Sequence, residues 1–154
     1  MNTWFVSFVF IIFCLVLGYS SALFQSDSMI TWYPNLDKSS LTPPGFVFPI
    51  VWTILYICIG LALAYVIFSK SENKTMLIVI WSFQMLFNFL WSFMFFYLKN
   101  PTLGFIDIVL LDITVLLFII YSFTPVRISS ILFMPYMAWL LLATYLNGYI
   151  MFKN

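Results

Sequence analysis

The chain has 154 residues, of which 64% are hydrophobic, 22% are aromatic and only 7% are charged. An ordinary globular protein has about 25% charged residues, so this chain has too few to cover a soluble domain. The formal net charge of +1 argues against a nucleic-acid partner, and the absence of histidine excludes catalysis or metal and haem ligation by histidine. The composition therefore predicts an integral membrane protein.

Five apolar segments are long enough to cross a bilayer as helices, which takes about 20 residues each. In chain order they are residues 4–24, 46–68, 76–98, 103–123 and 128–152. They lack the alternation of a membrane β-barrel and are about twice as long as its strands. We therefore predict an all-α membrane protein, a five-transmembrane-helix bundle that forms one domain over residues 1–154.

The first segment also allows a second interpretation, a secretory signal, because Ser20, Ser21 and Ala22 are small residues of the kind found at cleavage sites. However, the segment has no positively charged start, and its apolar stretch exceeds the usual length of about 7–15 residues. We therefore expect a retained transmembrane helix.

The connection over residues 25–45 is the one long loop between the expected helices. Loops of this length are usually functional lids or disordered linkers. This one carries Trp32, Tyr33 and Leu36 and ends in Pro43-Pro44-Gly45, so it is too aromatic for a solvated linker. We expect a folded cover over one end of the bundle. The later connections are short, which makes consecutive helices antiparallel neighbours, and three positive side chains on each side leave the membrane orientation open.

Residues three and four apart on a helix share a face, and three of the expected helices carry aromatic and amide residues at that spacing. The rows are Trp52 and Tyr56; Trp81, Gln84, Asn88, Trp91 and Phe95; and Tyr136, Trp139, Ala143 and Leu146 or Asn147. An amide in hydrocarbon is costly unless it faces the bundle interior, so Gln84 and Asn88 should point inward. The rows then predict an aromatic-lined cavity open toward the long loop, although simple helix packing would produce the same pattern.

Two carboxyl groups and two cysteines lie inside the apolar segments. Asp107 and Asp112 are candidates for a functional role because charged groups are rare within membranes, but structural hydrogen bonding is the alternative for both. Their spacing of five residues turns them in different directions, which argues against a paired acid–base site. Cys14 and Cys58 have no partners at metal-ligand spacing, so we expect small apolar side chains and no metal site.

Four ordered blocks of residues resemble a known family. The blocks are Trp32-Tyr33-x-x-Leu36-x-Lys38 with Pro43-Pro44 and Val47-Phe48-Pro49-x-Val51-Trp52-x-x-Leu55-Tyr56; Asn88-x-x-Trp91-Ser92-x-x-Phe95-Phe96; Asp107 followed by Ile and Leu; and Pro135-Tyr136-x-x-Trp139-x-x-x-Ala143-Thr144-Tyr145-Leu146-Asn147. Together they resemble the tryptophan-rich sensory protein and translocator protein family, also called the peripheral-type benzodiazepine receptor, in its bacterial form. Ser39 and Leu41 depart from the family pattern, where proline and an aromatic residue are common.

The resemblance implies a dimeric five-helix bundle that binds porphyrins, sterols and isoquinoline or benzodiazepine ligands in an intramembrane pocket. The residues that match the family's pocket positions are Tyr33, Trp52, Asn88, Trp91, Trp139, Ala143 and Leu146. The inward face of the third helix adds Gln84 to this set. Bacterial relatives are associated with sensing, transport and light-dependent breakdown of protoporphyrin, and the two tryptophans implied in that breakdown match Trp52 and Trp139.

We therefore expect a multi-pass receptor of the bacterial cell membrane that needs no cofactor and takes protoporphyrin IX as its ligand or substrate. The expected partners are porphyrins, drug-like apolar ligands, membrane lipid and a second copy of the chain, with no nucleic acid. Porphyrin degradation and transport of tetrapyrroles or sterols stay open as alternatives. The run Leu146-x-x-Tyr149-x-x-x-Lys153 fits a loose sterol motif, but a lysine that extends to the membrane surface explains it equally well.

Overall fold

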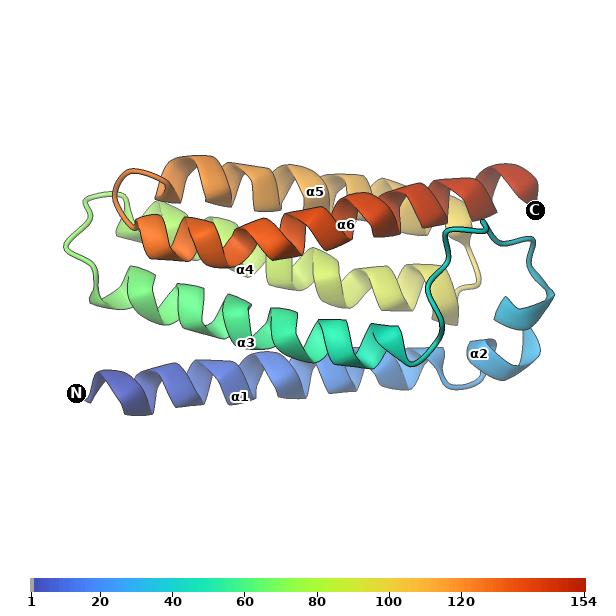
Figure 1. Cartoon of the computed structure of the whole chain (residues 1–154), viewed down its shortest axis with the longest axis horizontal. Helices are drawn as coiled ribbons and strands as arrows, with labels where there is room; N and C mark the ends of the chain where they lie inside the picture. Colours follow the sequence, from blue (N-terminus) through green and yellow to red (C-terminus); the bar gives the residue numbers. More distant parts are fainter. Residues whose placement is uncertain (1) are drawn as a thin grey trace.

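The computed structural model describes residues 2–154, and over that range the chain forms five helices long and apolar enough to cross a membrane (Figure 1). They are α1 (Thr3–Ala22), α3 (Val47–Phe68), α4 (Lys74–Ser92), α5 (Pro101–Ser122) and α6 (Arg127–Lys153). A sixth, short helix, α2 (Ser28–Thr31), lies in the long connection after α1. The predicted all-α bundle with five membrane-spanning helices and a folded loop between the first two is confirmed.

Asparagine side chains cap the N-terminal ends of two long helices, α1 and α5. The Asn2 side chain accepts a hydrogen bond from the backbone N–H of Trp4 at 3.1 Å, and Asn100 accepts one from Leu103 at 3.0 Å. Such caps satisfy donors that the first turn of a helix leaves free. At α5, Pro101 occupies the first helical position, where its missing N–H costs nothing. The sequence thus fixes where α5 starts after the turn that follows α4.

Helix α4 ends in a wider turn that the apolar pattern does not reveal. After Ser92 the backbone continues as a π-helical turn, η3 (Phe93–Tyr97), and the chain then reverses through Lys99, which has a positive φ of 51°. Within η3 the neighbours Phe95 and Phe96 are both buried. Turns of this type often occur at functional sites. Here η3 brings a group of aromatic rings beneath the long loop.

The bundle is layered so that α5 packs against α4 and α6, while α3 packs against α1 and α6 (Figure 1). The contact between α1 and α3 depends on Gly60. A Cβ atom at this position would lie 2.8 Å from the backbone of Ile11, closer than real Cβ contacts come. A small residue at the crossing lets two membrane helices approach closely. This crossing holds α1 on the bundle although most of its side chains face outward.

The long connection folds over the end of the bundle where α6 finishes (Figure 1). Ser28 donates a hydrogen bond to the carbonyl of Phe96 at 2.5 Å, and Asp27 forms an ion pair with Lys99 at 3.1 Å. At the other end of the connection, the Asn154 side chain accepts from the Asp37 backbone N–H at 2.9 Å and donates to its carbonyl at 3.2 Å. These bonds tie residues 25–45, which we call the cover, to η3 and α6.

Lys38 stabilises the shape of the cover itself. Its ammonium group donates to the carbonyls of Tyr33, Pro34 and Leu36 at 2.9, 3.1 and 2.9 Å. The same group lies 5.1 Å from the centre of the Tyr33 ring, within the range of a cation–π contact. A positive charge that satisfies three carbonyls holds the turn η2 (Tyr33–Asn35) in place. The cover is therefore an ordered structure, as the aromatic composition of the loop predicts.

Candidate intramembrane ligand site

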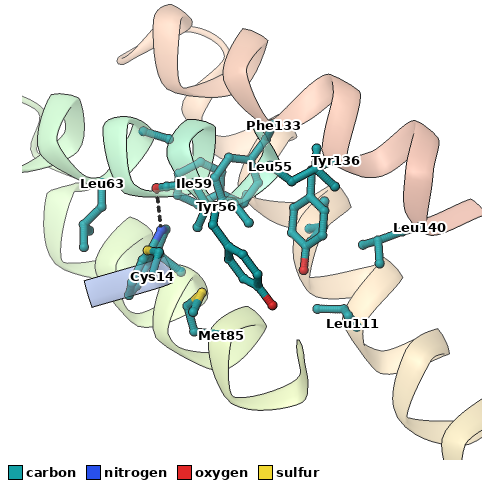
Figure 2. Packing of buried hydrophobic residues seen from close by; sticks show 14 of the residues in the cluster. Cys14, Leu55, Tyr56, Ile59, Leu63, Met85, Leu111, Phe133, Tyr136 and Leu140 are labelled. Carbon is teal, nitrogen blue, oxygen red and sulfur yellow. Dashed lines mark hydrogen bonds between the residues drawn. The ribbon is translucent and has the colours of Figure 1, made fainter. Parts of the chain in front are cut away.

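A hydrogen-bonded bridge of Tyr56, Asn88 and Tyr136 joins three helices inside the bundle. The Tyr56 hydroxyl on α3 donates to the side-chain oxygen of Asn88 on α4 at 2.8 Å. The Asn88 amide nitrogen then donates to the Tyr136 hydroxyl on α6, also at 2.8 Å. Figure 2 shows the two tyrosine hydroxyls pointing toward the same region of the core. All three residues are buried, which confirms that Asn88 faces inward.

Trp52 lies next to this bridge, one helical turn before Tyr56 on α3. Its ring stacks on Tyr56 with a centroid distance of 5.4 Å and an interplanar angle of 29°. It also meets the Tyr136 ring edge-on at 6.0 Å. Trp52 is half-buried, so part of its indole stays open to an incoming molecule. The half-buried indole of Trp52 thus lies directly beside the buried polar groups of the bridge.

A second group of aromatic side chains lies closer to the cover. Trp91 donates its indole N–H to the Asn147 side chain at 2.9 Å and stacks on Phe95 at 5.1 Å. The Phe95 ring contacts Trp32 and Tyr33 of the cover at 5.6 and 6.5 Å. The structure therefore brings the predicted site residues Tyr33 and Trp91 into one cluster. This cluster lies directly beneath the cover.

Trp139 occupies a different surface, where α3 and α6 meet the lipid. Its ring packs edge-on against Phe48 at 5.6 Å. It also lines an open groove of about 400 Å³ between the two helices. Ala143 and Leu146 follow on α6 and are half-buried, and Ala143 packs against the main core. The predicted site residues on α6 thus extend from the outer groove toward the cluster around Trp91.

Gln84 lies one turn from Asn88 on α4 and is fully buried. Within residues 2–154, neither its amide nitrogen nor its amide oxygen has a hydrogen-bond partner. Buried polar groups are nearly always paired, so an unpaired amide needs a reason. Because residues four apart share a helix face, Gln84 lies on the same side of α4 as Asn88. An unpaired donor and acceptor at this place suit a site that a polar ligand atom completes.

The two carboxyl groups of α5, Asp107 and Asp112, differ in their hydrogen bonding. Asp112 accepts a hydrogen bond from the Thr144 hydroxyl at 2.7 Å, which ties α5 to α6. Asp107 is 3% exposed, and the described part of the chain offers no partner for its Oδ2 atom. The structural hydrogen bond considered for Asp112 is therefore present, whereas none is seen for Asp107.

Spacing placed Tyr56, Tyr136 and Asn147 on inward faces but did not reveal their part in the site. Tyr56 and Tyr136 are the hydrogen-bond partners of Asn88, and Asn147 is the partner of Trp91. The signal in the sequence is their distance of three, four or eight residues from Trp52 or Trp139 on the same helix. That spacing gives the face of a helix, but it does not say which two side chains meet across helices.

Five membrane-spanning helices, an ordered cover and an interior set of aromatic and amide side chains define a polytopic α-helical membrane protein with an intramembrane aromatic site. Its sequence agrees with that class in detail, since the family model described as the TspO/MBR family matches residues 10–153. The chain belongs to this family, as its motifs predict.

Relatives from all three domains of life are similar to most of the chain. The tryptophan-rich protein TspO of Archaeoglobus fulgidus is 37% identical over 140 residues, which cover 91% of each chain. The protein of that name from Bacillus cereus is 34% identical over 140 residues, 89% of this chain and 90% of the relative. The human translocator protein is 25% identical over 122 residues, 77% of this chain and 72% of its own.

Proposed function

We propose that this protein is a membrane receptor that binds porphyrins, above all protoporphyrin IX, and apolar isoquinoline or benzodiazepine-type ligands. The observation that carries the proposal is the half-buried Trp52 ring, stacked on Tyr56 beside the polar bridge through Asn88. A flat macrocycle gains from area burial and from ring stacking, which is worth about 0.5–1.5 kcal/mol for each aromatic pair beyond the buried area. The unpaired amide of Gln84 offers the ligand a donor and an acceptor.

The remaining predicted ligand-binding residues fit around this centre as follows. Tyr33 and Trp91 supply aromatic surface beneath the cover, and Trp139 supplies a second indole at the outer groove. Ala143 and Leu146 are half-buried residues of α6, and the small side chain of Ala143 leaves room between helices. The proposed site thus extends from the inner faces of α3, α4 and α6 to the outer groove at Trp139.

Light-dependent degradation of the bound porphyrin is the proposed activity of this site. Molecular oxygen is the oxidant: it adds across a carbon–carbon double bond of the excited macrocycle, that bond is cleaved, and each of the two carbons keeps one oxygen atom as a carbonyl. Trp52 and Trp139 are the indoles that face the bound ring. The half-buried state of both rings supports this role because a ligand can reach them.

Transport of tetrapyrroles or sterols has less support. The far half of the bundle is closed by apolar packing, with Phe118 and Phe133 stacked at 4.0 Å and both fully buried. A ligand that binds on the cover side therefore meets a tightly packed layer before the opposite end. This arrangement favours binding and release within one half of the bundle over passage through it.

The proposal is tested by following the absorbance of protoporphyrin IX with the detergent-purified protein, in the light and in the dark. Tryptophan quenching measures binding in parallel, and Trp52→Phe and Trp139→Phe are compared with wild type. A defined product in the light, reduced in a variant that still binds, supports the activity. Equal bleaching in all three proteins would leave a porphyrin receptor without catalysis, and absence of saturable binding would refute the receptor itself.

A homodimer follows from the resemblance to the family and is proposed as the working assembly. Chemical cross-linking in native membranes, followed by mass measurement of the purified complex, tests it. A single species at the monomer mass, at protein concentrations matching those in the membrane, would contradict this proposal.

A further inference from the structure

We infer that flat apolar ligands enter the site sideways from the bilayer, through the groove between α3 and α6, and do not pass the cover. This inference rests on the proposed function and adds the route by which the ligand arrives. Two independent observations support it. The end of the bundle beneath the cover is closed by several polar ties, whereas the groove is open and is lined by hydrophobic residues.

Entry past the cover would require a set of polar contacts to break together. The Ser28 hydroxyl bonds to the Phe96 carbonyl, and Gln25 donates to the Ser92 hydroxyl at 3.1 Å. The bonds between Asp37 and Asn154 hold the opposite part of the cover on α6. Beneath these ties, Trp32 packs on Phe95. A macrocycle as wide as a porphyrin would have to lift the whole cover.

The groove offers a direct alternative. Its walls are Val51, Ile54 and Leu55 of α3 and Pro135, Ala138 and Trp139 of α6. All six side chains are apolar, and its volume of about 400 Å³ falls within the usual size range of ligand sites, about 300–1,000 Å³. Trp139 adds a ring on which a flat molecule can stack. A flat aromatic macrocycle dissolved in the bilayer can therefore pack on this surface through Trp139.

Two wall residues of the groove, Leu55 and Trp139, also pack against the interior site. Leu55 is 2% exposed and packs in the same core as Tyr56 and Tyr136 (Figure 2). Trp139 also packs against that core from the α6 side. A shift of these two side chains joins the lipid-facing groove to the ring of Trp52, which packs on the same core.

Helix α6 has a position where it bends easily, next to the wall residues that separate the groove from the core. Pro135 lies inside α6 and has no backbone N–H, so it cannot make the helical hydrogen bond to the carbonyl four residues before it. Helices bend most easily at such positions. Pro135 also lines the groove, so the place where α6 bends most easily coincides with the place where the groove must widen.

The test measures rates of protoporphyrin IX binding to the full-length protein in lipid nanodiscs by stopped-flow tryptophan quenching. Ala138→Phe fills the groove from an exposed position, and Ile113→Phe places the same side chain on a lipid-facing part of α5 as the control. Because a blocked route slows entry and exit alike, we expect both rates to fall about tenfold in Ala138→Phe with Kd almost unchanged. Ile113→Phe should retain the wild-type rates.

Two further variants make the result decisive. Ile54→Ala widens the groove and should raise both rates, which keeps the inference testable if Ala138→Phe does not fold. Asp27→Asn loosens the cover and should leave both rates unchanged.

Faster binding in Asp27→Asn with normal rates in Ala138→Phe would overturn the inference in favour of entry past the cover. An unchanged association rate in Ala138→Phe, with only the dissociation rate altered, would also overturn it, because the groove would then contact the bound ligand without being its route of entry. Absence of saturable binding by wild type would instead refute the proposed function.

Discussion

Asn88 accepts a hydrogen bond from Tyr56 and, through its other amide atom, donates one to Tyr136, so a single side chain satisfies the phenols of two other helices. The bridge lies among buried side chains of a bundle that crosses the membrane, where water does not replace a lost partner. Its loss should therefore affect both the stability of the bundle and the shape of the proposed site.

Replacing Asn88 by alanine should lower the free energy of unfolding by about 2–6 kcal/mol, because two buried hydroxyl groups lose their partner at about 1–3 kcal/mol each. Unfolding by denaturant in detergent micelles, followed by circular dichroism, measures the change. Ser82→Ala on the exposed side of α4 is the control and should change stability by less than about 0.5 kcal/mol. Equal effects of the two substitutions would show that the bridge contributes nothing to stability.

Replacing Gln84 by leucine should raise the free energy of unfolding, in contrast to the loss of Asn88. The Gln84 amide is buried without a partner within residues 2–154, so leucine removes a desolvation cost and should raise stability by about 1–3 kcal/mol. At the same position, loss of the donor and acceptor should weaken protoporphyrin binding. Thermal unfolding and tryptophan quenching on one preparation give both values. Lower stability with unchanged binding would contradict this prediction.

Gly60→Val should destabilise the contact between α1 and α3. A Cβ atom there comes within 2.8 Å of the Ile11 backbone, which cannot move aside like a flexible side chain. Overpacking of this kind costs about 1–3 kcal/mol. Gly45→Val provides the comparison, because a Cβ atom there meets nothing within 4 Å. Unfolding curves of the two variants should separate clearly, and coincident curves would rule out a tight crossing at Gly60.

The ion pair between Asp27 and Lys99 gives the cover a dependence on pH. Lys99, through its hydrogen bond and its charge, holds the pKa of Asp27 below its ordinary value. Because the folded pKa is the lower one, the contribution to stability is present above the unfolded pKa, about 3.9, and disappears as pH falls through the folded pKa.

Lys99→Gln should therefore raise the pKa of Asp27 toward its ordinary value. The carboxyl carbon resonance of Asp27, followed by NMR during an acid titration, measures that pKa directly. Lys70→Gln at the opposite end of the bundle is the control and should leave it unchanged. An Asp27 midpoint that is the same in wild type and Lys99→Gln would show that the ion pair does not form in solution.

The general architecture could be predicted because it depends on local properties of the chain. Apolar segments of membrane-spanning length define the helices, and the aromatic composition of residues 25–45 indicates an ordered cover. The inward face of α4 follows from the amides at 84 and 88, since hydrocarbon excludes them from the outer surface. These properties can be read from the sequence without knowing which helices are neighbours.

The partners inside the site could not be predicted in the same way. Whether Asn88 meets Tyr56 and Tyr136, and whether Gln84 stays unpaired, depends on the distances and rotations between helices. The π-helical turn at Phe93–Tyr97 likewise leaves no mark in an apolar segment, because it changes hydrogen bonding and not composition. The aromatic rows predict a cavity that opens toward the cover, whereas in the structure the cover is tied down and an open groove lies at Trp139.

Helix α6 carries both Trp139 in the groove and Lys153 at its end, after which Asn154 binds the backbone of Asp37. Trp139 and Asn154 are separated by about 22 Å of chain at a rise of 1.5 Å per residue. Because α6 is a continuous helix over this length, a small tilt where a ligand displaces Trp139 becomes a larger displacement at the membrane surface. Occupancy of the groove inside the bilayer would thereby change the position of the cover at the aqueous surface.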